Sequence, residues 1–359
     1  MQTSAKLLLA ATLAPIAAAA SPSFAQSVPG FTVSTYANPT HPVLLSFGPD
    51  GTLFAGRDPV ATGSTTPVKP TRIGPGGSPV ASMGAVNIPD PDTVLLDVTG
   101  SISGVAGTLL VGGLLDGSST SGQISGIRPD DSVVQVFAGG PWANPVEMKF
   151  DAEGRLVFTD SVSRGIWVST GSAPTLLATL PGSAAPTYLT FSPSGQIVVG
   201  GSDGVIRIYN ADGSPADGSF ASFGSLGGIE HAPGGAFGTD LHVLDSAAGT
   251  LVRVSPAGAK TIIGTGFATG AATKDIAFGP CGNLFVSVHS QNAVRVIAPL
   301  GCACNYTSEP DFDGSGSVDG ADLGALLGAW GTDDCATDLN RDGIVDGADL
   351  GILLAGWGV

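Results

Sequence analysis

Two stretches near the C-terminal end place acidic and hydroxyl side chains at one repeated spacing. Counted from Asp311, side-chain oxygens recur at alternate residues, and the same pattern starts again at Asp338. Ca²⁺ takes six to eight oxygen ligands, and a twelve-residue loop supplies them from positions 1, 3, 5, 7, 9 and 12. The sequence therefore predicts two bound calcium ions. The predicted ligands are Asp311, Asp313, Ser315, Ser317, Asp319 and Asp322 in the first loop and Asp338, Asn340, Asp342, Ile344, Asp346 and Asp349 in the second.

The residues between these ligands suit the same loop. Gly316 and Gly343 occupy position 6, where the chain turns sharply, and position 7 contributes a backbone carbonyl rather than a side chain. Val318 and Val345 follow at position 8, and we expect them to form the short strand through which paired loops meet. An acidic, glycine-rich linker with chance spacing is the alternative, but two full matches argue against it.

One amphipathic helix is predicted after each loop. Leu323, Leu326, Leu327 and Trp330 recur at i, i+3, i+4 and i+7, and Leu350, Leu353, Leu354 and Trp357 repeat that spacing. Each set forms one apolar stripe along a helix. Half of the stripe is expected to be buried between the two helices, and the rest is available as a docking face.

A calcium loop followed by one helix, duplicated and with Asp at position 12, resembles a type I dockerin over residues 304–359. The resemblance implies that calcium folds this segment and that the segment binds a cohesin-like module on another protein. Dockerins often carry Ser-Thr at positions 10 and 11, whereas both copies here read Gly-Ala (Gly320-Ala321 and Gly347-Ala348). A cell-envelope protein is therefore kept beside a cohesin-like protein as the expected partner.

A longer repeat occupies the residues before the tail. Apolar segments that end at Phe47, Phe150, Phe191 and Phe278 are each followed by a turn with glycine and a second apolar segment. This pattern indicates β-hairpins, because glycine supplies the positive φ of the turn. With the further strands between them, the repeats average about 46 residues, which predicts four-stranded propeller blades.

Counting the repeats gives six blades, and the last one is a strand short. The spare segment "GFTVSTYAN" from Gly30 is expected to pair with "NAVRVIAP" and close the ring, which removes both free sheet edges. The pattern resembles six-bladed propellers of the NHL and gluconolactonase type.

That resemblance implies a divalent metal at the channel mouth, held by Glu, Asn and Asp side chains. Asp160 and Asp245 match the Asp of the motif, but His41 stands in the first-blade segment where Glu is expected, and Thr187 stands in place of Asn. The two Asp residues are more often turn braces, because a carboxylate accepts backbone N–H bonds.

Other residues with catalytic chemistry lack partners in the sequence. Glu230-His231 is an acid/base pair by type, His289 is either a channel or a loop residue, and His242 is expected to face solvent or a neighbouring blade. No nucleophile motif is present. No catalytic constellation can be read, and a small molecule or glycan at the channel is the expected ligand.

The N-terminal residues predict export. Lys6, the apolar run Leu7–Ala20 and the small residues Ser23 and Ala25 are typical of a signal peptide cleaved before Gln26. No later segment is apolar enough to span a membrane. Acidic residues outnumber basic ones 30 to 14 without a basic cluster, so nucleic acid is an unsuitable partner. The expected location is outside a bacterial cell or on its envelope.

Four cysteines, Cys281, Cys302, Cys304 and Cys335, suggest two disulfides in an exported protein, with three possible connectivities. Cys304–Cys335 is favoured, since each precedes one of the calcium loops. The remaining pair would join the last strands to the start of the tail.

These observations predict a mainly β protein, a six-bladed β-propeller followed by a small α-helical, calcium-binding, dockerin-like domain. The expected domains are a signal peptide at 1–25, the propeller at 26–301 and the dockerin-like domain at 302–359. The function expected is a binding or scaffold propeller attached through its tail to a partner. The alternative is a secreted hydrolase (a lactonase or glycoside-acting enzyme) or lyase in polysaccharide catabolism that carries a dockerin.

Overall fold

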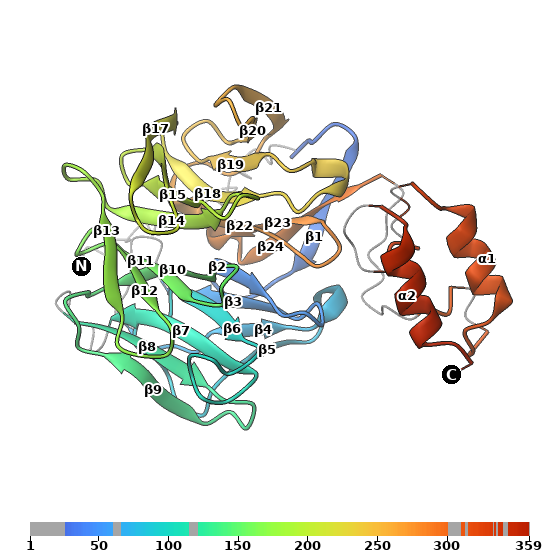
Figure 1. Cartoon of the computed structure of the whole chain (residues 1–359). Coiled ribbons are helices and arrows are strands. Elements are labelled where there is room, and N and C mark those ends of the chain that lie inside the picture. The colour runs from blue at the N-terminus through green and yellow to red at the C-terminus, as the bar shows by residue number, and fades with distance from the viewer. Residues whose placement is uncertain are drawn as a thin grey trace, which may run out of the picture.

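Six four-stranded antiparallel sheets surround a common centre in this computed structural model (Figure 1). The structure describes residues 26–59, 66–114, 121–300, 310–312, 315–332, 334, 337–339 and 344–358. The chain is mainly β, and two short helices lie near its C-terminal end. This architecture confirms the predicted six-bladed propeller.

The first three blades run in chain order from an inner to an outer strand. Their strands are β2 (Pro42–Phe47), β3 (Leu53–Arg57), β4 (Thr71–Ile73) and β5 (Val80–Ser82); β6 (Thr93–Asp97), β7 (Thr108–Leu114), β8 (Gly122–Ile127) and β9 (Val133–Ala138); and β10 (Pro145–Phe150), β11 (Leu156–Asp160), β12 (Gly165–Ser169) and β13 (Thr175–Thr179).

The fourth and fifth blades follow the same order, and the sixth combines both ends of the ring. Their strands are β14 (Pro186–Phe191), β15 (Ile197–Gly201), β16 (Val205–Tyr209) and β17 (Pro215–Ser222); β18 (Leu226–His231), β19 (Leu241–Asp245), β20 (Thr250–Val254) and β21 (Lys260–Thr265); and β22 (Thr273–Phe278), β23 (Leu284–Val288), β24 (Ala293–Pro299) and β1 (Phe31–Ala37). The 3₁₀ turns are η1 (Pro75–Gly77), η2 (Gly235–Phe237), η3 (Gly270–Ala272) and η4 (His289–Gln291).

Glycine makes the predicted turns between the first two strands of a blade. Gly51, Gly154, Gly195 and Gly282 all have positive φ, between 68° and 80°. Residues that carry a side chain rarely adopt this backbone conformation, whereas glycine adopts it without strain. The repeated Phe-turn-Gly pattern therefore specifies the hairpins directly.

The ring closes through β1, as the sequence predicts. β1 pairs antiparallel with β24, from Phe31 opposite Pro299 to Ala37 opposite Val294. The outer strand of the last blade thus comes from the start of the chain. This pairing gives the last blade strands from both ends of the propeller, whereas each of the other five blades is built from consecutive strands.

Apolar residues pack between adjacent blades. In the interface of the first and last blades, the rings of Phe47 and Phe285 lie 4.7 Å apart between centroids, beside the buried Leu53 and Val294. Equivalent clusters fill the other interfaces. This burial holds the inner strands in fixed positions around the channel.

Helices α1 (Gly320–Gly328) and α2 (Gly347–Ala355) lie side by side and form a small second core (Figure 1). Leu326 and Leu353 are fully buried there. Leu327, Trp330, Leu354 and Trp357 remain 51%, 46%, 51% and 44% exposed. Each predicted stripe is therefore divided into a buried half and an exposed half.

The predicted strand contact between the loops is wrong in its partners. Val318 does not pair with Val345; it bridges to Trp357, and Gly358 N donates to Val318 O at 3.0 Å. Val345 O accepts from Gly331 N at 2.8 Å. Each loop thus pairs with the segment after the other helix, because the start of each helix lies beside the end of the other.

Cys281 is disulfide-bonded. The other three cysteines and residues 1–25, the predicted signal peptide, lie outside the described residues, so the pairing and the domain limits stay predictions. In the described part of the chain no helix is long and apolar enough to cross a membrane.

Candidate functional site

The channel is surrounded by the inner strand of every blade, β2, β6, β10, β14, β18 and β22. Alternate side chains of a strand face the same side. Five polar or charged residues stand at the third or fifth place of four successive or adjoining inner strands: Glu147 and Lys149 in β10, Thr190 in β14, Glu230 in β18 and Asp275 in β22. These five residues are named the channel cluster below.

An ion pair joins two blades across the cluster. Lys149 Nζ donates to Glu230 Oε2 and lies 3.9 Å from Glu147 Oε1. Thr190 Oγ1 lies on the intervening blade and donates to Glu230 Oε1 at 2.9 Å. Glu230 therefore has partners on both of its oxygens.

Two carboxylates fasten neighbouring blades to one another. Glu147 Oε2 accepts from Leu189 N of the next inner strand at 2.7 Å, and Asp275 Oδ2 accepts from Leu45 N at 2.8 Å. Both acceptors are third residues and both donors are fourth residues of their strands. The same inter-blade bond is thus built at two places in the ring.

Burial and like charges shift the titration of these groups. Burial, followed by the charge of Asp275, raises the pKa of Glu147 well above its usual range. Burial raises the pKa of Asp275 to about 7, although Lys149 opposes the shift. Burial alone would lower the pKa of Lys149, but Glu230 and Glu147 raise it above its usual value. Lys149 is therefore a fixed cation, Asp275 exchanges a proton near neutral pH, and the carboxyl of Glu147 holds its proton more strongly than an exposed one.

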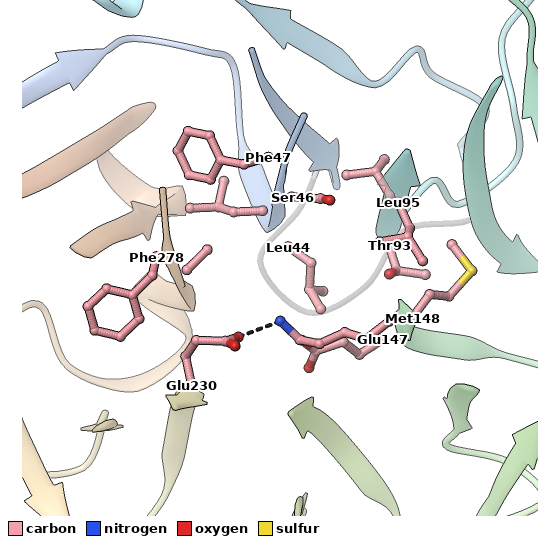
Figure 2. Close-up of a pocket in the computed structure, with 13 residues that line it drawn as sticks. Leu44, Ser46, Phe47, Thr93, Leu95, Glu147, Met148, Glu230 and Phe278 are labelled. Carbon is pink, nitrogen blue, oxygen red and sulfur yellow. Dashed lines mark hydrogen bonds and ion pairs between the residues drawn. The ribbon is translucent and has the colours of Figure 1, made fainter. Parts of the chain in front are cut away.

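A cavity of about 90 Å³ lies beside the cluster. In Figure 2, Glu147 and Glu230 lie on one side of the cavity, and Phe47 and Leu95 lie on the other. Leu44, Ser46, Thr93, Met148 and Phe278 also line it. The cavity thus joins a polar wall to an apolar wall.

A second polar group gathers where the first inner strand begins. His289 Nε2 lies 2.7 Å from Asp58 O, and its ring stacks on His41 with centroids 5.0 Å apart. Burial and the charge of Asp58 raise the pKa of Asp90 to about 6, and burial and Asp90 raise that of Asp92. His289 is thus a buried residue of this group.

The Asp residues expected at a lactonase-type metal site act as turn braces. Asp160 accepts from Ala143 N at 2.8 Å, from Ser163 N at 2.6 Å and from Asn144 N. Asp245 accepts from Ala247 N at 3.0 Å and from Ala248 N at 3.2 Å. Their oxygens are used by the backbone, as the bracing interpretation predicts.

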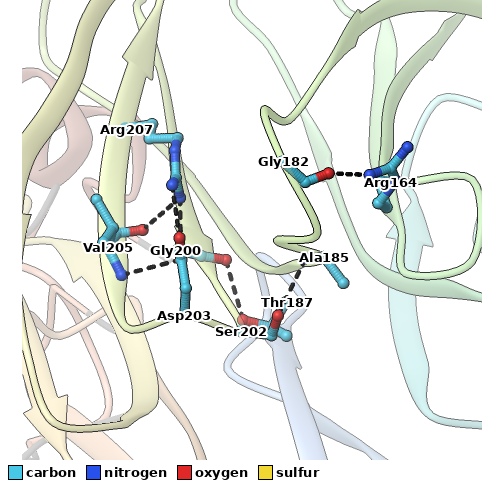
Figure 3. A network of polar contacts seen from close by, with 9 residues as sticks. All are labelled: Arg164, Gly182, Ala185, Thr187, Gly200, Ser202, Asp203, Val205 and Arg207. Carbon is cyan, nitrogen blue, oxygen red and sulfur yellow. Dashed lines mark hydrogen bonds and ion pairs between the residues drawn. The ribbon is translucent and has the colours of Figure 1, made fainter.

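Thr187 is also engaged within its own blade. Its hydroxyl donates to Gly200 O at 2.9 Å, next to the bond from Ala185 N to Ser202 Oγ (Figure 3). Asp203 and Arg207 form a two-bond ion pair close by. These bonds stabilise the β15–β16 turn and leave Thr187 with a structural role.

The histidines of the fifth blade differ in burial. His242 is buried against the rings of Phe237 and Phe278, which agrees with a position facing the neighbouring blade, and burial lowers its pKa to about 4. His231 Nδ1 lies 3.3 Å from Thr239 O, and burial lowers its pKa. His231 is therefore not paired with Glu230, whose partners are Lys149 and Thr190.

The first predicted calcium loop is wound around its acidic side chains. Asp311 accepts from Ser315 N at 3.0 Å and from Gly316 N at 2.7 Å. Asp322, at the other end of the loop, is fully buried and accepts from Phe312 N at 2.7 Å. The carboxylates at positions 1 and 12 thus turn toward the same short loop, which suits a hard cation.

The remaining predicted ligands fall into three groups. Ser317 O accepts from Ser315 Oγ at 3.1 Å, Asp338 and Asp349 are buried, and Ile344 is exposed. Asp319 and Asp346 cap the two helices, accepting from Ala321 N and Ala348 N. Asp313, Asn340 and Asp342 lie outside the described residues.

Both helices begin with the same capping box. Asp322 accepts from Asp319 N at 2.9 Å, and Asp349 accepts from Asp346 N at 2.8 Å. Such reciprocal bonds satisfy the free N–H groups of a helix start. Within the described ranges no three His, Cys, Asp or Glu side chains are grouped to hold a metal ion, and the calcium sites stay a prediction.

Sequence reasoning missed Glu147, Lys149 and Asp275. The signal that could have identified them is a charged residue at the third or fifth place of an inner strand. Other inner strands have Leu44, Ser46 or Ala277 at these places. Which of these strands meet across the channel depends on the ring geometry.

Comparison with known proteins supports the fold. The WD domain, G-beta repeat family matches residues 174–210, which include β13 to β16, and none of the curated proteins matches the sequence. The gluconolactonase of Xanthomonas campestris is similar, with a TM-score of 0.57 at 15% identity over 76% of this chain and 90% of that one.

Two further solved structures have the same fold. A glucose dehydrogenase gives a TM-score of 0.54 at 15% identity over 76% of this chain and 100% of that one. The virginiamycin B lyase from Staphylococcus aureus gives 0.50 at 12% identity, over 75% and 98% of the two chains. At these identities the likeness shows a six-bladed propeller and leaves the chemistry open.

Proposed function

We propose that this chain is an exported propeller protein whose helical tail binds two calcium ions and attaches the propeller to a cohesin-like or cell-envelope partner. The observation that carries the proposal is the duplicated tail. Both helices start with an Asp capping box, and both position-12 carboxylates, Asp322 and Asp349, are fully buried. A buried carboxylate is costly unless hydrogen bonds or a cation compensate it.

The residues that would hold the ions are the loop oxygens named above. Calcium would compensate the negative charge of the loops and fix the starts of α1 and α2. Asp311 and Asp322, which close on one loop, fit this role. The tail would then fold fully only when the ion is bound.

The exposed halves of the two helices support a docking role. Leu327 and Trp330 on α1 have counterparts in Leu354 and Trp357 on α2, and all four are exposed. Apolar side chains grouped in this way are typical of contact surfaces. The duplication presents two similar faces, so a partner would have two ways to bind.

Calcium binding by the chain 26–359 tests the proposal. Isothermal titration is expected to give two ions per chain, and Asp311→Ala and Asp338→Ala are each expected to remove one, because each deletes the first ligand of a loop. Asp217→Ala, an exposed Asp on β17, is the matched control and should leave two. No heat at millimolar calcium would reject the calcium-dependent tail.

A hydrolase or lyase acting on a lactone or glycan is the second candidate. It is favoured by the buried Glu147 carboxyl, whose raised pKa suits a general acid beside the channel cavity. The bracing bonds of Asp160 and Asp245 argue against the metal site of such enzymes. Turnover of a lactone by the propeller, lost in Glu147→Gln, would favour this candidate.

A further inference from the structure

The two inter-blade carboxylates of the channel share an unusual feature. Each uses one oxygen for the neighbouring blade and leaves the other without a hydrogen bond. Asp275 Oδ1 is buried and has no partner, while Glu147 Oε1 meets only the distant Lys149 Nζ, at 3.9 Å. Asp275 and Glu147 are 2% and 4% exposed as whole residues. Two buried carboxylate oxygens of the inner strands therefore lack a hydrogen-bond donor.

These carboxylates act on each other. The charge of Asp275 is the second cause, after burial, of the raised pKa of Glu147. Lys149 is the one cation of the channel cluster, and its hydrogen bond goes to Glu230. Three carboxylates thus share one ammonium group, and the charge balance of the channel is negative when all of them are ionised.

We propose that the channel cavity binds a small primary ammonium ion between the open oxygens of Glu147 and Asp275. Glu147 lines the cavity directly, and Leu45, whose N–H holds Asp275, lines it as well. The apolar wall of Phe47 and Leu95 would receive a short alkyl group. The volume of about 90 Å³ limits the ligand to a few heavy atoms.

An ammonium ion would supply the donors that Lys149 does not give to Glu147 and Asp275, because the hydrogen bond of Lys149 goes to Glu230. Its N–H donors match carboxylate oxygens that lack donors, and its charge relieves the repulsion between Glu147 and Asp275. Binding requires ionised carboxylates, so a proton held by the pair passes to the solvent when the cation enters. The ligand and the proton therefore compete for the same oxygens.

Several charged or titratable groups face Asp275. They are Glu147 and Lys149 on β10, Tyr188 on β14 and Glu230 on β18. Since Asp275 has a pKa of about 7, affinity is expected to rise with pH up to about 7 and to level off above it, by about tenfold for each pH unit below 7.

The test uses methylammonium chloride as the probe and the chain 26–359 in phosphate buffer. Isothermal titration at pH 8 is expected to show saturable binding of one ion, and binding at pH 6 is expected to release a proton, measured in unbuffered solution. Tetramethylammonium, which has no N–H donor, and sodium chloride at equal ionic strength should give no saturable heat. Absence of saturable methylammonium binding at pH 8 overturns the proposal.

Two variants locate the site. Asp275→Asn keeps an acceptor for Leu45 N but removes the charge, and it is expected to weaken binding by at least about tenfold. Ser46→Leu fills the cavity from β2 and is expected to abolish binding, whether or not Asp275→Asn folds. Asp217→Asn, on the exposed strand β17, is the matched control. Binding that is unchanged in Ser46→Leu places the ion elsewhere and overturns the proposal.

Discussion

Single carboxylates of the propeller carry the bonds between blades. Glu147 and Asp275 each accept one backbone N–H from the next inner strand, a charge-assisted bond that is stronger than a neutral one. The same burial that makes the bond strong disfavours the charge, because a carboxylate in low dielectric loses its hydration. The hydrogen bond that each carboxyl group accepts therefore stabilises the ring, whereas the burial of its negative charge destabilises the ring.

Asp275 is expected to make stability depend on pH. Its pKa rises from 3.8 to about 7 on folding, so the folded state retains a proton that the unfolded chain has lost. The free energy of unfolding should be highest below about pH 4, fall as pH rises to about 7 and stay low above it. Asp275→Asn cannot ionise, so this fall should shrink, by up to about 4 kcal/mol between pH 4 and pH 8.

Urea unfolding of the unchanged chain and of Asp275→Asn, each at pH 4.5 and pH 8, measures how much the variant reduces the pH dependence of stability. Asp217→Asn on the exposed strand β17 serves as the control and should change stability equally at both pH values. If Asp275→Asn also shifts stability by the same amount at the two pH values, Asp275 is not the group that retains the proton.

At the scale of elements, the inner strands differ at their third residue, and this sets how closely blades approach. Gly228 takes that place in β18, where β10 and β22 carry carboxylates. A Cβ on Gly228 would lie 2.6 Å from Ile276 N in β22, and its φ is +140°. The backbone of β18 at Gly228 lies directly against the backbone of β22 at Asp275 and Ile276, so there is no room for a side chain on Gly228.

Gly228→Ala is therefore expected to destabilise the propeller. Separating β18 from β22, or straining the backbone, should lower the free energy of unfolding by about 1–3 kcal/mol. Gly218→Ala in the exposed strand β17, where a Cβ would have nothing within 4 Å, is the matched control and should stay within about 0.5 kcal/mol. Chemical unfolding followed by circular dichroism compares them, and equal effects would contradict this close approach.

Local pattern predicted the elements because each hairpin is specified by its own residues. Phe47 and Gly51 repeat in later blades, and strand and turn follow from them. The channel cluster could not be predicted in this way, because Lys149 and Glu230 belong to blades far apart in the sequence. The partners of Val318 and Val345 were missed for the same reason, since the antiparallel packing of α1 and α2 decides them.

At the scale of the whole molecule, the strand pairing that completes the last blade joins distant parts of the chain. β1 supplies the outer strand of the last blade, and Val28 packs with Leu251 and Phe267 beside it. Without β1, β24 would become an edge with unpaired N–H and C=O groups. Closure also places β22 next to β2, where Asp275 bonds to Leu45 N.

A chain that begins at Asn38, and so lacks β1, is expected to lose this closure. Its Tm should fall by at least about 10 °C relative to the chain 26–359, because a strand of bonds and its buried side chains are removed together. The peptide 26–37 added in trans should restore much of the loss by pairing with β24. Thermal melts with and without the peptide make the measurement, and a scrambled peptide is the control. A shortened chain that melts at the original temperature as a monomer would mean that the apolar interfaces between blades hold the ring closed without β1.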